Sequence, residues 1–257
     1  MKIFLLICLV LLVPGFSGCA QTYETGGGPL TASERSNEVA ETNLSLGIAY
    51  LQRGEYETSL EKLNRALSAD PNYTPTLNAL GLLYQRLGKP VEAEDYFKRA
   101  LNRNAMDPST LNNYGQFLCT NNRYDEAQEA FMKAAKNPLY GTPEISITNA
   151  GTCALRNNQP DIAEQHFRNA LEKNPGVPIA LIQMSQLTYD QGNYLSARGY
   201  LQRYLELARH TASSLWLGIQ IEQQLGDKNT LSSYALSLKN NFPESREAVL
   251  LRESGIR

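Results

Sequence analysis

Apolar residues beyond about residue 40 recur three and four positions apart along this chain. This spacing is typical of helices that bury one face and expose the other. Glycine or asparagine interrupts the pattern at regular intervals, where a helix would end and the chain would turn. The pattern therefore predicts a series of short helices joined by tight turns.

The helical pattern itself repeats. Four glycines, Gly47, Gly81, Gly115 and Gly151, are spaced by 34, 34 and 36 residues, and the segment 138–144 holds the two additional positions. Small residues follow each glycine at a fixed offset, and a bulky apolar residue follows each small one: Ser59 and Leu63, Ala93 and Phe97, Ala127 and Phe131, Ala163 and Phe167. Small residues let two antiparallel helices approach closely, and the bulky residues fill the space between layers.

The expected turns between paired helices carry residues that tolerate a left-handed backbone. Gly54, Gly88 and Gly192 occupy this position, and Asn122 and Asn158 replace glycine in two units. Two further units follow in register. The fifth has Ser185 in the first glycine position, and the sixth has Gly218 there and Gly226 one position late.

A 34-residue unit with this pattern of small and bulky positions resembles the tetratricopeptide repeat, a helix–turn–helix motif. The resemblance implies an all-α fold, an α-solenoid with a right-handed superhelical twist and about six repeats over residues 37–243. Residues 244–257 would then form a C-terminal capping helix that covers the last apolar face.

The N-terminus has the features of an export signal. Lys2 precedes an apolar run, residues 3–13, that is shorter than the roughly 20 residues a membrane-spanning helix needs. The small residues before Cys19 resemble the bacterial lipobox, in which the cysteine is lipidated and the peptide is cut in front of it. The resemblance implies a lipoprotein signal peptide at 1–18. An ordinary signal peptide that is cut nearby, with Cys19 incidental, is the alternative.

The residue after the cysteine is Ala20 and not the aspartate that resembles an inner-membrane retention signal. By that analogy the lipid anchors the protein in the inner leaflet of the outer membrane, facing the periplasm. Residues 19–36 are rich in glycine, serine and threonine, and we expect them to form a flexible tether.

In a solenoid of this kind, the first helix of each repeat lines a concave groove. We expect the N-terminal part of the groove to be apolar and its middle to carry amides. Asparagine side chains both donate and accept hydrogen bonds, so they can hold the backbone of an extended peptide. Solvated helix-surface positions are the alternative for any one of them. The expected groove residues are Leu44, Ile48, Leu51, Asn78, Leu82, Gln85, Asn112 and Gln116.

Two of the four cysteines lie in the repeats. Cys119 and Cys153 fall at similar heights on the first helices of consecutive repeats, which are neighbours in a solenoid. In an oxidising periplasm this pair predicts a disulfide. Two buried free thiols are the alternative. A zinc site is not expected from this spacing.

Composition and motifs favour a binding protein and not an enzyme. The formal net charge of −2 offers no basic surface for nucleic acid. The two histidines, His166 and His210, do not lie near an expected nucleophile, and there is no glycine-rich phosphate loop after a strand. We therefore expect no catalytic residues, metal site, cofactor or small-molecule substrate.

The stretch NNYGQFLC at 112–119, paired with NAGTC at 149–153, resembles the PilF/PilW family of type IV pilus biogenesis lipoproteins, and the resemblance extends over the whole chain. It implies a pilotin, which brings subunits of the type IV pilus secretin to the outer membrane and promotes their multimerisation. The alternative is a lipid-anchored scaffold that recruits periplasmic peptidoglycan hydrolases or envelope-assembly partners.

Overall fold

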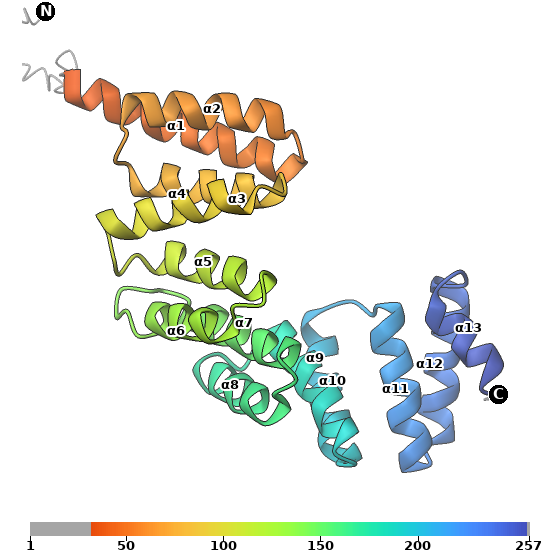
Figure 1. Ribbon diagram of the computed structural model, residues 1–257. Coiled ribbons are helices and arrows are strands. Elements are labelled where there is room, and N and C mark those ends of the chain that lie inside the picture. The colour runs from red at the N-terminus through yellow and green to blue at the C-terminus, as the bar shows by residue number, and fades with distance from the viewer. Residues whose placement is uncertain (1–31, 256–257) are drawn as a thin grey trace, which may run out of the picture.

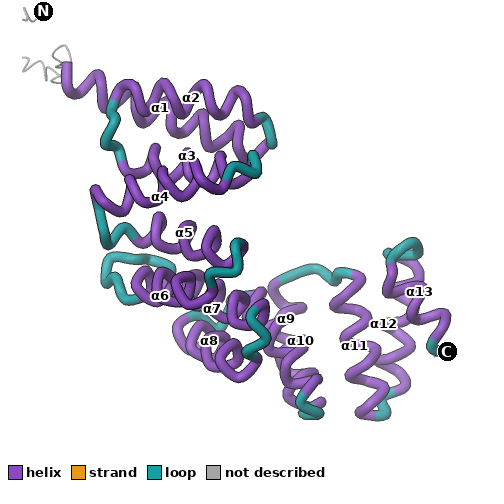
Figure 2. The backbone as a smooth tube through the Cα atoms, viewed as in Figure 1, coloured by secondary structure: helices purple, strands orange, loops and turns teal. Residues whose placement is uncertain are grey.

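The computed structural model describes residues 32–255, which contain thirteen helices and no strands (Figures 1 and 2). The first twelve form six antiparallel pairs. The pairs are α1 (Ala32–Arg53) and α2 (Tyr56–Ala69), α3 (Thr74–Arg86) and α4 (Pro90–Arg103), α5 (Pro108–Thr120) and α6 (Tyr124–Ala135), α7 (Pro143–Arg156) and α8 (Pro160–Lys173), α9 (Pro178–Asp190) and α10 (Tyr194–Leu207), and α11 (Ala212–Leu225) and α12 (Lys228–Asn241). The last helix is α13 (Arg246–Glu253).

The pairs stack in chain order into an elongated array. Figure 1 shows α1 to α8 stacked in one direction and the array turning where α9 and α10 follow, so that α11 to α13 form a second arm. The first helices of the early repeats, α1, α3, α5 and α7, contact one another in sequence. The predicted all-α solenoid of six tetratricopeptide repeats is confirmed.

Five of the six repeats are closed by a contact between a glycine and a bulky side chain sixteen residues later. A Cβ atom added at Gly115 would lie 2.7 Å from the ring of Phe131, and additions at Gly47, Gly81, Gly151 and Gly218 would meet the same obstruction. Any larger residue would therefore push the two helices apart. In the fifth repeat Ser185 takes the glycine position, and its hydroxyl donates a hydrogen bond to the Ala197 carbonyl (2.8 Å).

The turns and the first turns of the helices carry residues that suit the backbone conformation at those positions. The residues between paired helices adopt positive φ, including Asn122 at 61° and Asn158 at 54°, which confirms the predicted left-handed turns. Proline lies in the first turn of α3, α4, α5, α7, α8 and α9. Its missing N–H is not needed at that position, and its fixed φ suits the start of a helix.

The first helix begins earlier than the sequence predicted. Helix α1 starts at Ala32, so residues 32–36 are helical and not part of a flexible tether. The glycines and proline that disfavour a helix all precede this point. The Ser36 hydroxyl donates to the Ala69 carbonyl at the end of α2 (2.6 Å), which fixes the start of α1 to its partner helix. The expected signal peptide, Cys19 and the remainder of the tether lie outside the described residues.

The far end of the array is covered by α13. Ser245 caps this helix by accepting a hydrogen bond from the Ala248 amide, and Ala248 and Leu251 are buried against α11 and α12. Among residues 32–255, no helix combines the length and the apolarity needed to cross a bilayer.

Candidate functional site

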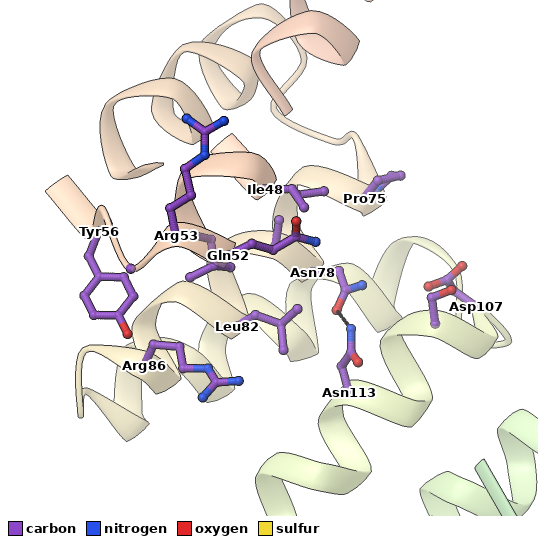
Figure 3. A pocket seen from close by; sticks show the side chains of 14 residues that line it. Ile48, Gln52, Arg53, Tyr56, Pro75, Asn78, Leu82, Arg86, Asp107 and Asn113 are labelled. Atoms are coloured by element: carbon purple, nitrogen blue, oxygen red, sulfur yellow. Dashed lines mark hydrogen bonds between the residues drawn. The ribbon is translucent and has the colours of Figure 1, made fainter. Parts of the chain in front are cut away.

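A cavity of about 870 Å³ lies across the first three repeats, between α1, α3 and the start of α5 (Figure 3). We call it the N-terminal groove. Four of the predicted groove residues line it: Ile48, Leu51, Asn78 and Leu82. The other lining residues are Gln52, Arg53, Gly54, Tyr56, Pro75, Ala79, Arg86, Asp107, Ser109 and Asn113.

The floor of the groove is aliphatic. Leu51 and Leu82 are half-buried, and Ile48 is 37% exposed. Residues three or four positions apart share a face of a helix, so Ile48 and Leu51 lie on one face of α1, and Asn78 and Leu82 lie on one face of α3. Both faces line this cavity. Covering exposed aliphatic surface of this kind with an apolar ligand favours binding, because the surface is removed from water.

An asparagine pair crosses the groove between α3 and α5. The Asn113 amide donates from Nδ2 to Oδ1 of Asn78 (3.1 Å), and Figure 3 shows the two side chains pointing toward each other. This bond fixes their orientation and uses one donor and one acceptor. Both residues line the cavity, and within residues 32–255 Asn78 Nδ2 and Asn113 Oδ1 make no further hydrogen bond. Together these two atoms match the C=O and N–H of a peptide backbone.

Charged residues lie at opposite ends of the groove. Arg53 and Arg86 are at the C-terminal ends of α1 and α3, and both are exposed. Asp107 is at the start of α5, where its carboxylate accepts a hydrogen bond from the Thr110 amide (2.7 Å) and caps the helix. The groove is therefore positive at one end and weakly negative at the other.

Two predicted groove residues are buried in the repeats instead. Leu44 is 8% exposed and packs in the core with Leu63 and Leu80. Asn112 is also 8% exposed, and its Oδ1 accepts hydrogen bonds from Ser146 Oγ (3.1 Å) and Asn149 Nδ2 (2.9 Å). The structure therefore places Asn112 between α5 and α7 and not in the N-terminal groove, where the sequence placed it.

The remaining two predictions fall outside the N-terminal groove. Gln85 is half-buried on α3 but does not line the cavity. Gln116 is exposed over a smaller hollow of about 140 Å³ that also contains Cys119 and Arg156. Asn113 and the two arginines were not predicted from the sequence. The sequence signal for Asn113 is its place directly after Asn112, the residue that the repeat register aligns with Asn78.

Cys119 and Cys153 come together as the repeat register predicts. They lie on α5 and α7, are 6% and 1% exposed, and have Cα atoms 5.9 Å apart. This separation is typical of a disulfide. The pair therefore occupies the same joint between repeats three and four as the Asn112 hydrogen bonds.

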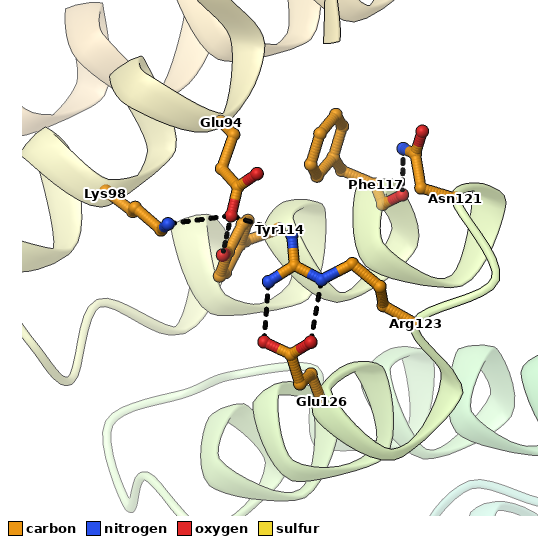
Figure 4. Close-up of polar contacts among 7 residues, drawn as sticks. All are labelled: Glu94, Lys98, Tyr114, Phe117, Asn121, Arg123 and Glu126. Carbon is orange, nitrogen blue, oxygen red and sulfur yellow. Dashed lines mark hydrogen bonds and ion pairs between the residues drawn. The ribbon is translucent and has the colours of Figure 1, made fainter. Parts of the chain in front are cut away.

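A charged cluster joins repeats two and three outside the groove (Figure 4). Glu94 on α4 accepts hydrogen bonds from Tyr114 (3.0 Å) and Arg123 (2.7 Å) and pairs with Lys98 (2.8 Å). Burial opposes ionisation of Glu94, but these three donors outweigh it and lower its pKa to about 2. Burial and the neighbouring carboxylate raise the pKa of Tyr114 to about 12. Glu126 completes the cluster through Arg123.

The histidines lie apart from the groove and from each other. Burial lowers the pKa of both His166, on α8, and His210, after α10. Among residues 32–255, no three metal-ligating side chains gather into a potential metal site. What the groove offers is an aliphatic surface, backbone-matching amides and two cations, a combination suited to holding a peptide.

Comparison with known proteins agrees with this architecture. Profiles of the tetratricopeptide repeat match residues 38–104 and, separately, residues 78–140 and 148–212. The fold therefore defines a tetratricopeptide-repeat protein, a class that binds protein partners.

More specific relatives come from type IV pilus systems. The type IV pilus assembly protein PilF of Pseudomonas aeruginosa is 31% identical over 92% of this chain and 93% of its own length. The solved structure of P. aeruginosa PilF matches with a TM-score of 0.78 and 30% identity, covering 86% of this chain and 99% of that one. The structure of PilW, a type IV pilus biogenesis factor, matches with a TM-score of 0.74 and 28% identity, covering 84% and 99%. The chain belongs to the PilF/PilW family of type IV pilus biogenesis proteins.

Proposed function

We propose that this protein is an outer-membrane lipoprotein that acts as pilotin for the type IV pilus secretin. The observation that carries the proposal is an open, partly apolar groove in a chain that shares its fold and 31% of its residues with PilF. The lipobox-like sequence before Cys19 supports the membrane anchor.

The two parts have separate roles in this proposal. The lipid on Cys19 determines the destination, the inner leaflet of the outer membrane. The N-terminal groove binds a segment of a secretin subunit, with Leu51 and Leu82 covering its apolar side chains and Asn78 holding its backbone. Binding several subunits near one membrane raises their local concentration, which favours ring assembly.

The proposal includes a disulfide between Cys119 and Cys153. The Cα separation of 5.9 Å supports it, and an oxidising periplasm would form it. The bond would tie repeat three to repeat four and so hold α5, which contributes Asn113 to the groove, in a fixed position.

A deletion strain tests the function. Unheated outer-membrane extract is separated on a gel and probed for the secretin. We expect loss of the high-mass ring and accumulation of monomer in the inner membrane, and rescue by the wild-type gene. An intact, correctly placed ring would overturn the pilotin role. Altered cell shape with an intact ring would favour the scaffold that recruits peptidoglycan hydrolases or other envelope-assembly partners.

Variants in the same strain separate the two parts. Cys19→Ala should give a periplasmic protein that no longer fractionates with the outer membrane, and retention there would contradict the lipid anchor. Leu82→Asp places a charge on the groove floor and should prevent ring assembly with the protein still at the membrane. Leu236→Asp, at a 60% exposed position on α12, is the matched control and should assemble rings normally.

A further inference from the structure

The two arginines of the N-terminal groove have no acidic partner in the part of the chain that the structure describes. Within residues 32–255, neither Arg53 nor Arg86 has a carboxylate oxygen within 4.0 Å, whereas Arg65, Arg123 and Arg198 each pair with glutamate. Arg53 lies over the Tyr50 ring, 5.9 Å from its centroid, and both arginines are exposed. Two unpaired guanidinium groups beside one cavity create a local positive potential.

No other charge at the groove cancels this potential. Among the described residues, Asp107 is the single acidic one that lines the cavity, and it lies at the far end, where it already caps α5. Figure 3 shows Arg53 and Arg86 on different helices, on the side of the cavity away from Asp107, with their guanidinium groups pointing in opposite directions. Leu82 is on the same helix as Arg86, one turn away, so cationic and aliphatic surfaces are adjacent.

We propose that the N-terminal groove selects an extended peptide segment in which an internal Asp or Glu side chain neighbours aliphatic residues. The carboxylate binds Arg86, which is one helical turn from Leu82, and Arg53 adds to the positive potential of that end. The aliphatic side chains cover Leu51 and Leu82. The peptide backbone bonds to the free amide groups of Asn78 and Asn113. The inference rests on the proposal that the groove holds a peptide, but not on the identity of that peptide as secretin.

The groove favours an internal acidic side chain over a terminal carboxylate. Arg53, Gly54 and Arg86 all line this end of the cavity and are all exposed to solvent. The positive end is therefore open, and a bound chain can continue past it into solvent. A site built for a chain terminus would need no such exit.

A synthetic peptide array tests this preference with the full-length mature protein. The probes are short peptides with a Leu-Val-Leu core and one flanking position that is Glu, Asp, Gln or Lys. They are attached through their C-termini, so that no terminal carboxylate is free. We expect binding to the Glu and Asp peptides in preference to Gln and Lys. The double variant Arg53→Gln/Arg86→Gln should bind the Glu peptide about tenfold more weakly, because charge-assisted hydrogen bonds are lost.

Arg209→Gln provides the matched control, because Arg209 is exposed, makes no ion pair within residues 32–255 and lies in the loop after α10. It should bind like wild type. Equal binding of Glu and Gln peptides, no binding at all, or an acidic preference that survives in the double variant would each overturn the inference. Binding only to peptides attached in the opposite direction, with a free C-terminus, would also overturn it. Secretin ring assembly is scored separately, so either proposal can fail while the other stands.

Discussion

Two asparagine pairs in the same repeat register serve different purposes in this protein. Asn113 donates to Asn78 across the N-terminal groove, and Asn149 donates to Asn112 one repeat later. Asn78 is half-buried beside a cavity, whereas Asn112 is buried and accepts a second hydrogen bond from Ser146. The difference shows that the neighbours of an asparagine decide whether it is available to a ligand.

The residue equivalent to Ser146 explains part of this difference. In the preceding repeat it is Thr110, which is buried and whose hydroxyl finds no hydrogen-bond partner in the described part of the chain. Asn78 therefore receives one hydrogen bond where Asn112 receives two. The joint between repeats three and four also contains Cys119 and Cys153 and is closed, whereas the joint between repeats two and three remains open.

The largest effect is expected from breaking the packing of the third repeat, which contributes to both joints. Phe131 is 1% exposed and packs against Gly115, so Phe131→Ala should lower the unfolding free energy by about 3–5 kcal/mol. Chemical denaturation followed by circular dichroism measures this loss. Leu236→Ala, at an exposed position, should change it by less than about 0.5 kcal/mol.

Removing the cysteine pair should open the closed joint. Cys119→Ser/Cys153→Ser should lower stability by about 2–4 kcal/mol if the two residues are crosslinked. Adding a reductant should destabilise the wild type and leave the double variant unchanged. Mass spectrometry of unreduced protein should find a peptide that joins Cys119 to Cys153, and two alkylatable thiols in periplasmic protein would contradict the disulfide.

Replacing Asn112 and Asn78 by alanine, one at a time, tests directly whether the two joints differ. Asn112→Ala leaves the buried Ser146 donor and the half-buried Asn149 donor without their acceptor and should cost about 1–3 kcal/mol of stability. Asn78→Ala should cost less than about 1 kcal/mol, because its surroundings are partly open to water, but it should weaken peptide binding. Thermal unfolding and the peptide-binding assay measure the two effects. Equal stability losses would show that the joints do not differ in the way described.

The smallest effect concerns the cluster that holds repeats two and three at a fixed angle. The folded pKa of Glu94, about 2, is below its ordinary value, so its contribution to stability is present above about pH 4.5 and is lost as the pH falls toward 2. We expect this contribution to be about 1 kcal/mol, because solvent reaches a quarter of the side chain and screens the charges. Unfolding midpoints of wild type and Glu94→Gln should converge as the pH falls through this window, and a constant difference between them would contradict the assignment.

The sequence predicted the repeats more accurately than the site. Glycine, small and bulky positions recur with a fixed period, and they fix which helices pair and where each turn lies, including Asn122 and Asn158. The groove residues were harder to predict, because adjacent positions on one helix can face the cavity or the next repeat. Asn112 and Asn113 differ in this way: a rotation of one position along α5 separates a buried joint from the groove.

The sequence pattern also did not predict where α1 begins. Residues 32–36 lack the apolar periodicity that indicates a buried face, yet they extend the helix, and Ser36 is fixed by a hydrogen bond to Ala69. Tertiary contact, which a local pattern does not contain, determined this boundary.

The contacts that close each repeat have a consequence for the order of folding. Gly115 and Phe131 are only sixteen residues apart, and the corresponding pairs at Gly47, Gly81, Gly151 and Gly218 are equally local. Proteins dominated by local contacts fold fast, and each unit of a repeat array can form on its predecessor. All residues that line the N-terminal groove lie between Ile48 and Asn113. A chain that emerges with its N-terminus first would therefore complete its N-terminal groove while the last three repeats are still unfolded.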